Sequence, residues 1–86
     1  MKISVELTLV PIQDEFKDVI KAFILQLRNS KFEVLENPLS TQIYGDYQEL
    51  MPFLTNTIEN TFKNTEHVLV NMKIVKSDRS SYEPSF

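Results

Sequence analysis

The spacing of the apolar residues constrains the fold more than any other feature of this 86-residue chain, because it alternates between two periods. In the first and last of four predicted strand segments an apolar residue stands at every second position, and in the third Ile43 stands between polar Gln42 and half-polar Tyr44, which is typical of strands with one buried face. The first segment ends at Pro11, since proline cannot donate a backbone hydrogen bond to a neighbouring strand. The predicted strands are residues 1–10, 32–36, 40–44 and 66–76.

In two other segments the apolar residues stand three and four positions apart, which is typical of amphipathic helices. The first helix is capped by Gln13 or Asp14, and the second runs from about Tyr47 to Phe62. Proline removes a backbone hydrogen bond from a helix, so the second helix either begins near Pro52 or has a bent first turn. The predicted buried stripes are Phe16, Val19, Ile20, Phe23, Ile24 and Leu27 in the first helix, and Leu50, Phe53, Leu54, Ile58 and Phe62 in the second.

This order of elements predicts an α+β fold, a ferredoxin-like βαββαβ sandwich with both helices on one face of a four-stranded antiparallel sheet. Residues 1–76 form this single domain, and residues 77–86 are a polar tail that is predicted to be disordered. No element is expected to cover the second face of the sheet, which we call the open face. Its predicted side chains are Ser4, Glu6, Thr8, Gln42, Tyr44, Leu69, Asn71 and Lys73.

The composition argues against several classes of function. A net charge of −3 argues against binding to nucleic-acid phosphates, and the absence of cysteine excludes disulfides and thiolate metal sites. No stretch approaches the roughly 20 apolar residues of a membrane span, and Glu6 interrupts the region where a signal peptide would be apolar. His67 is the only histidine, so no metal site or catalytic constellation is predicted. We therefore expect a cytoplasmic protein without catalytic residues, metal or cofactor.

Gly45, the only glycine, marks the junction between the third strand and the second helix. Asp46 and Glu49 resemble a capping box there, and ligands are often held at helix N-termini. A glycine at this position allows either a sharp turn or the close approach of another group to the backbone. Tyr44 and Tyr47 flank it, and each ring either stacks on a ligand or packs at the helix entry. A binding site is expected at this junction.

Two polar groups are expected near the open face. Glu6 and Lys73 lie on strands that should be neighbours, so they form either a surface ion pair or a site in which the carboxylate is held for a ligand's cation. Ser40, Thr41 and Gln42 follow one another on the third strand. Because successive side chains point to opposite faces, at most two of these three serve one site, and ordinary strand and turn chemistry is the alternative.

The segment Ser4–Pro11, followed by Leu39–Tyr47 and a helix, resembles the small thiamine-binding proteins of the YkoF-like family. The resemblance covers residues 1–76, and its most specific part is the run Ser-Thr-Gln-aliphatic-aromatic-Gly-acidic-Tyr. It implies a ferredoxin-like fold, association through the sheets into dimers or higher oligomers, and binding of thiamine or its hydroxymethylpyrimidine part. Pro52 departs from the helix-forming residue that the resemblance leads us to expect.

The resemblance also implies roles for individual residues. Glu6 would offset the charge of the cationic thiazolium ring, and Tyr44 would stack on a ring of the ligand. The third strand would supply hydrogen bonds to the aminopyrimidine edge, and Gly45 would let the ligand approach the backbone. The implied ligand-binding residues are Glu6, Asn37, Ser40, Thr41, Gln42, Tyr44, Gly45 and Asn71.

The expected function is non-enzymatic binding of thiamine or hydroxymethylpyrimidine by a homo-oligomer, a dimer or tetramer joined through sheet faces or edges. No nucleic acid or membrane is expected as a partner. One alternative is a regulatory interaction module of ferredoxin-like fold that uses the open face only to dimerise. Another is an acylphosphatase-like enzyme, which would need a glycine-rich phosphate loop beside an arginine. The sequence has no such loop, and Arg28 and Arg79 stand at a helix end and in the tail.

Overall fold

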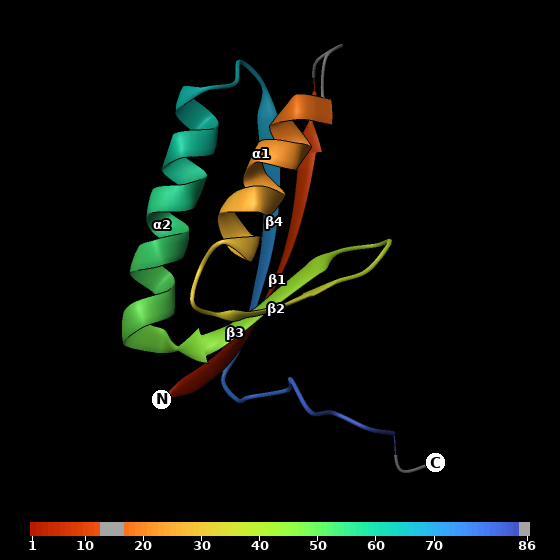
Figure 1. Ribbon diagram of the computed structural model, residues 1–86, viewed down its shortest axis with the longest axis vertical. Helices are drawn as coiled ribbons and strands as arrows, with labels where there is room; N and C mark the ends of the chain where they lie inside the picture. Colours follow the sequence, from red (N-terminus) through yellow and green to blue (C-terminus); the bar gives the residue numbers. More distant parts are fainter. Residues whose placement is uncertain (13–16, 85–86) are drawn as a thin grey trace.

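The computed structural model describes residues 1–12 and 17–84 (Figure 1). The predicted ferredoxin-like α+β fold is confirmed. The cap expected at Gln13 or Asp14 and the burial expected for Phe16 lie outside the described residues. No helix within these two ranges is long and apolar enough to cross a membrane. In chain order the elements are β1 (Lys2–Pro11), α1 (Lys17–Arg28), β2 (Glu33–Glu36), β3 (Thr41–Asp46), α2 (Tyr47–Lys63) and β4 (Val68–Val75).

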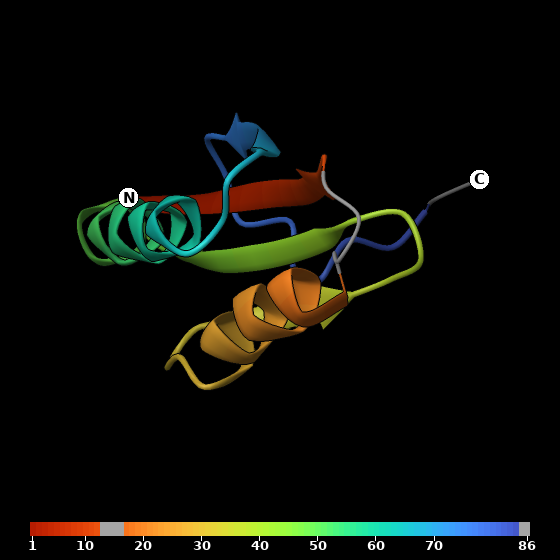
Figure 2. The ribbon, with the colours of Figure 1, turned by 90° about the horizontal axis from the view of Figure 1, so that it is seen from above.

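The sheet has the strand order β2-β3-β1-β4, and every neighbouring pair is antiparallel. The central strand β1 pairs with β3 on one side and with β4 on the other, so Glu6 stands opposite both Gln42 and Lys73. Directly opposite side chains share a face, and these three therefore lie together on the open face. Figure 2 shows both helices on one side of the sheet and the chain after β4 on the other.

The core fills the space between the two helices and the covered face of the sheet. The central strand β1 contributes alternate side chains, as its period of two predicts, and each helix contributes one stripe. Burial of one large aliphatic or aromatic side chain stabilises a fold by about 1.5–3 kcal/mol. The buried hydrophobic residues are Ile3, Val5, Leu7, Phe23, Leu27, Ile43, Leu50 and Leu54.

Helix α2 departs from its predicted stripe in its second half. Phe62, predicted to be buried, is 50% exposed, so that prediction is wrong. Thr57 and Thr61 are buried instead. Their hydroxyls donate to the carbonyl oxygens of Phe53 and Thr57 at 2.9 and 3.0 Å. Because the helix itself satisfies these hydroxyls, two polar side chains face the interior without an unpaired group.

Helix α2 begins well before Pro52 and continues through it, so the alternative in which the helix begins near Pro52 is wrong. Asp46 caps the helix, and its carboxylate accepts a hydrogen bond from the backbone N–H of Gln48 at 3.1 Å. Glu49 binds elsewhere, with one carboxylate oxygen 2.6 Å from Nζ of Lys31. The Asp46 part of the predicted capping box is therefore confirmed, whereas Glu49 holds the segment that precedes β2.

Gly45 lies inside β3 rather than in a turn, and its φ is not positive, so the sharp turn predicted as one use of this glycine is wrong. The close approach is confirmed, but it comes from the protein itself. A Cβ atom at Gly45 would stand 2.7 Å from Cδ1 of Phe32. The Phe32 ring thus packs directly on the glycine, and this contact fixes the segment before β2 against the end of β3.

The open face is not bare along its whole length. Ser4 is 7% exposed because residues Ser77 and Arg79 lie against it. The prediction that no element covers this face is therefore wrong at Ser4, because the chain turns back across the sheet after β4. The division into a domain of residues 1–76 and a disordered tail stays a prediction.

We predict that Gly45→Ala destabilises the fold by about 1–2 kcal/mol, because the added methyl group collides with the Phe32 ring in a packed site. The measurement is the free energy of unfolding in urea. The matched background is Phe32→Ala, in which the collision is absent and Gly45→Ala should be neutral or slightly stabilising, since alanine restricts the unfolded chain. Equal destabilisation in both backgrounds would show that the ring contact is not the cause.

Candidate functional site

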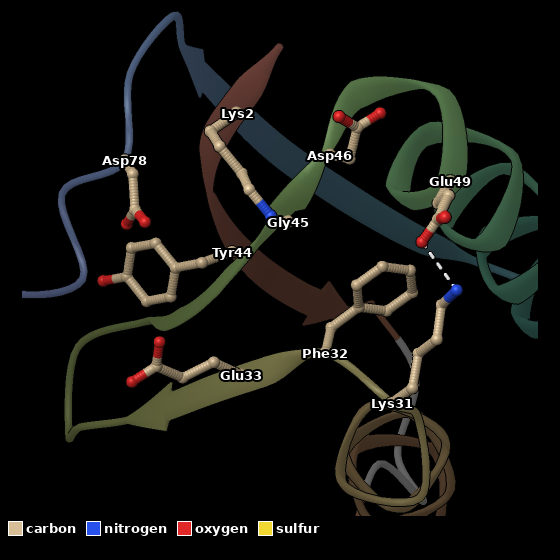
Figure 3. A pocket seen from close by; sticks show the side chains of 9 residues that line it. All are labelled: Lys2, Lys31, Phe32, Glu33, Tyr44, Gly45, Asp46, Glu49 and Asp78. Atoms are coloured by element: carbon tan, nitrogen blue, oxygen red, sulfur yellow. Dashed lines mark ion pairs between the residues drawn. The ribbon is translucent and has the colours of Figure 1, made fainter.

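A cleft of about 490 Å³ lies where β3 ends and α2 begins (Figure 3). This volume falls within the roughly 300–1,000 Å³ of typical small-ligand sites. It is also the junction at which the sequence predicts a site. The lining residues are Lys2, Lys31, Phe32, Glu33, Tyr44, Gly45, Asp46, Glu49 and Asp78.

The cleft exists because β2 is shorter than β3. The strand β2 starts at Glu33, which pairs with Tyr44, so the last two residues of β3 extend past the start of β2. The chain before β2 turns away there, and Phe32 packs back onto Gly45. This leaves a recess beside the end of β3. Lys2 of β1 and Glu49 in the first turn of α2 line its other sides.

Tyr44 presents the aromatic surface on the open-face side of the cleft. Figure 3 shows its ring between the carboxylates of Glu33 and Asp78. Burial raises the pKa of the Tyr44 phenol above its ordinary range, and the nearby Glu33 and Asp78 carboxylates raise it further. The phenol therefore stays protonated and neutral at physiological pH. An aromatic face beside two carboxylates suits a cation or a cationic heterocycle.

The N-terminus of α2 is already occupied by the protein's own groups. Asp46 accepts a hydrogen bond from the N-terminal ammonium of Met1 at 3.1 Å as well as from the backbone N–H of Gln48. The hydrogen bond from the ammonium lowers the pKa of Asp46 the most, and the bond from Gln48 lowers it further, so this pKa lies below its usual range. The backbone N–H of Tyr47 donates to the carbonyl of Met1 at 2.9 Å. These contacts use donors that would otherwise attract an anion.

The opposite wall is held by an ion pair and by two phenylalanine rings that pack at a tilt. Lys31 lies 2.6 Å from Glu49 and its Nζ stands 5.6 Å from the centre of the Phe32 ring. The Phe32 and Phe53 rings pack with their centres 5.4 Å apart. Four carboxylates and two lysine ammonium groups line the cleft as a whole. Its formal charge is therefore negative, which favours a cationic ligand over a phosphate.

A second group of predicted residues forms one hydrogen-bonded cluster on the open face. The Ser40 hydroxyl donates to Glu6 at 3.0 Å, and Nζ of Lys73 lies 3.7 Å from the other Glu6 oxygen. The Gln42 amide donates to the Ser40 hydroxyl at 2.9 Å and accepts from Asn37 Nδ2 at 3.2 Å. We call these five residues the polar cluster. The surface ion pair offered as one interpretation of Glu6 and Lys73 is thus confirmed.

The remaining predicted residues are divided between the two faces. Tyr44 and Gly45 line the cleft. Asn71 is exposed on β4, opposite Thr8 on the open face. Thr41 is buried on the covered face, where it stands opposite Leu7. Thr41 therefore shares neither the cleft nor the polar cluster, as the alternation of side chains along β3 requires.

Several cleft residues were not predicted from the sequence. Glu33 had a usable signal, since a hairpin register between the second and third strands places it opposite Tyr44. Phe32 and Lys31 precede β2 and meet the cleft only through the packing on Gly45 and the pair with Glu49. Asp78 had no signal, because its position depends on the path of the chain after β4.

No group of three or more potential metal ligands occurs among the described residues. His67, expected at the surface, is exposed. Its carbonyl accepts a hydrogen bond from the backbone N–H of Ile12 at 2.8 Å. This histidine therefore contributes a backbone contact at the start of β4.

The sequence and the fold are both similar to those of known proteins. The sequence model of the family described as thiamine-binding protein matches residues 5–84. No curated protein matches the sequence at a significant level. Among solved structures, the protein SP2199 of Streptococcus pneumoniae is 26% identical, with a TM-score of 0.83 over 94% of this chain and 92% of that chain.

Two more distant structures share the fold. A Thermotoga maritima protein proposed to act in thiamine biosynthesis or salvage is 16% identical, with a TM-score of 0.79 over 90% of this chain and 85% of that chain. A domain of unknown function from Bacillus cereus is 18% identical, with a TM-score of 0.71 over 99% of this chain and 79% of that chain. With the family match spanning nearly the whole sequence, the chain belongs to the thiamine-binding protein family.

Proposed function

We propose that this protein binds thiamine or its hydroxymethylpyrimidine part in the cytoplasm without transforming it, and that the ligand enters the cleft between β3 and α2. The observation that carries the proposal is the Tyr44 ring flanked by Glu33 and Asp78 in a cleft of about 490 Å³. Membership of the thiamine-binding protein family supports a ligand of this class.

The chemistry of thiamine fits this surface. Its thiazolium ring carries a permanent positive charge, which the negatively charged lining would attract. A cation over the face of a tyrosine ring gains about 0.5–1 kcal/mol at an exposed site and more where water is excluded. The carboxylates beside Tyr44 add to that attraction. Binding of this kind needs no nucleophile or general base.

The polar cluster supplies what an aminopyrimidine needs. That ring both donates and accepts hydrogen bonds along one edge. The Gln42 amide has two N–H groups and two oxygen lone pairs, of which the polar cluster uses one each, so it offers both kinds of partner. Gln42 and Tyr44 stand two residues apart on β3, so their side chains lie next to each other on the open face. A ligand with a cationic ring and a pyrimidine ring could therefore span the cleft and the polar cluster.

We predict that isothermal titration calorimetry shows saturable binding of thiamine, and that Tyr44→Ala weakens it about tenfold through loss of the ring surface. Tyr44→Phe keeps the ring and should bind within about threefold of the wild type. Flat traces with both thiamine and hydroxymethylpyrimidine, from folded protein, would reject ligand binding and favour the regulatory interaction module.

Glu6→Gln tests the contribution of the polar cluster. We predict that it weakens thiamine binding about two- to fivefold at low salt, the range expected of one partly exposed charge. The matched control is Glu59→Gln, which removes a carboxylate from an ion pair with Lys63 on α2. The mass of the oligomer in solution should not change in either variant. Loss of the oligomer with unchanged affinity would assign Glu6 to an interface instead.

We also propose that the protein associates through β4. This strand lies at the edge of the sheet, and an edge presents unpaired backbone groups that can pair with another chain. It carries three exposed apolar side chains, Leu69, Met72 and Ile74. Two copies of β4 paired with each other would satisfy the backbone groups of both edges and bring these side chains next to those of the partner strand.

The prediction is that light scattering coupled to size exclusion gives the mass of a dimer or tetramer, and that Met72→Lys lowers it to that of the monomer. The reason is that a lysine at the paired edge would bury an unpaired charge. Leu39→Lys is the control, because Leu39 is a highly exposed apolar residue outside β4. A monomeric wild type, or an oligomer that Met72→Lys leaves intact, would contradict association through this strand.

A further inference from the structure

The chain after β4 is tied to the sheet at one buried hydroxyl. The Ser4 hydroxyl donates to the backbone carbonyl of Ser77 at 2.7 Å and accepts from the backbone N–H of Arg79 at 2.8 Å. Ser4 is buried by this contact although it lies on the open face. The Ser4 side chain therefore binds the residues directly before and after Asp78, and we call this pair of hydrogen bonds the latch.

Asp78 is also oriented by its own turn. Its carboxylate accepts hydrogen bonds from the backbone N–H of Ser80 at 2.9 Å and from the Ser80 hydroxyl at 2.6 Å. These bonds hold the pKa of Asp78 below its usual range, so it is ionised at neutral pH. A further bond, from the backbone N–H of Tyr82 to the carbonyl of Arg79 at 3.1 Å, closes the turn. The carboxylate therefore has a defined place.

That place is the cleft. Ser4 stands directly opposite Tyr44 in the pairing of β1 with β3, so the latch lies next to the tyrosine. Asp78 lines the cleft, and Figure 3 shows it across the Tyr44 ring from Glu33. The family match extends through residue 84 and so includes this segment.

We propose that residues 77–80 form a wall of the ligand site, in which Ser4 is a positioning residue and Asp78 favours a cationic ligand over a neutral one. The inference rests on the proposed function of the same cleft. It assigns the discrimination between whole thiamine, which is a cation, and neutral hydroxymethylpyrimidine to a carboxylate from the end of the chain.

The charges around the cleft explain why Asp78 has this effect. Glu49 is paired with Lys31, and Asp46 with the terminal ammonium. Glu33 and Asp78 flank Tyr44, and Lys2 also lines the cleft. Removal of the Asp78 charge would leave one carboxylate, Glu33, and one ammonium group, Lys2, among these three charged residues, which would abolish the excess negative charge beside Tyr44.

The first experiment tests the latch on the full chain without ligand. Trypsin cuts after lysine and arginine, so the rate of cleavage after Arg79, identified by the mass of the fragment in mass spectrometry, reports how often the segment detaches. Ser4→Ala should raise this rate about tenfold, the factor expected for the loss of one to two net hydrogen bonds. Ser4→Thr keeps the hydroxyl and should restore the slow rate.

The matched control for Ser4→Ala is Ser77→Ala. Ser77 enters the latch through its backbone carbonyl, and its own hydroxyl is buried without a hydrogen-bond partner among the described residues. The same chemical change at Ser77 should therefore leave the cleavage rate unchanged. Equal rates in Ser4→Ala and the wild type would overturn the latch.

The second experiment measures discrimination by calorimetry. Asp78→Asn should weaken thiamine binding about two- to fivefold at low salt, with the effect reduced at high salt, because the charge is exposed and screened. Its affinity for neutral hydroxymethylpyrimidine should stay that of the wild type. Asp18→Asn, the same change on α1, should leave both affinities unchanged. Saturating thiamine should also slow cleavage after Arg79 in the wild type.

The outcomes separate the two proposals. If the wild type binds thiamine and Tyr44→Ala weakens it while Asp78→Asn does not, the role of residues 77–80 is overturned and the proposed function stands. Equal weakening of both ligands by Asp78→Asn would also overturn the specificity role. If the wild type binds neither ligand, the proposed function falls and this inference falls with it, even where the trypsin experiment confirms the latch.

Discussion

The pairing of β1 with both of its neighbours is the constraint on which the rest of the structure depends. Because side chains alternate along a strand, a slip of one residue would move Ile3, Val5 and Leu7 from the core to the open face. The same register brings Glu6 beside Lys73 and Ser4 beside Tyr44. The strand register therefore determines both the hydrophobic core and the polar surface, and burial of the core strongly favours this register over the alternatives.

The cleft follows from a mismatch in strand length and one glycine. The four residues of β2 leave the end of β3 without a neighbour on that side. Phe32 fills part of the gap by packing on Gly45, where a Cβ atom would not fit. The glycine therefore serves packing rather than a turn. The contact places the Phe32 ring on one side of the cleft, and Tyr44 borders the cleft on the open face.

The electrostatics of this cleft differ from those of a common ligand site at a helix N-terminus. Such a terminus ordinarily attracts anions through its unpaired backbone N–H groups. Here Asp46 occupies that position and binds the N-terminal ammonium as well. With the helix end capped by a carboxylate, the other acidic residues set the character of the cleft. A junction that resembles a phosphate site in outline is thereby suited to a cation.

Apolar periodicity alone determined the number, order and type of the elements, because burial on one face imposes a period of two on strands and of 3.6 on helices. It also placed Glu6 and Lys73 on neighbouring strands of one face, as the structure has them, while Gly45 and the cap residues marked the junction at which the cleft lies. It failed at Phe62, because local hydrogen bonds made threonines acceptable in the core. Only the tertiary structure decided that Phe32, packed on Gly45, and Asp78, beside Tyr44, line the same cleft. The first depends on packing between segments far apart in the sequence, and the second on a chain reversal that joins Ser4 to a residue 73 positions away, and no local pattern records either.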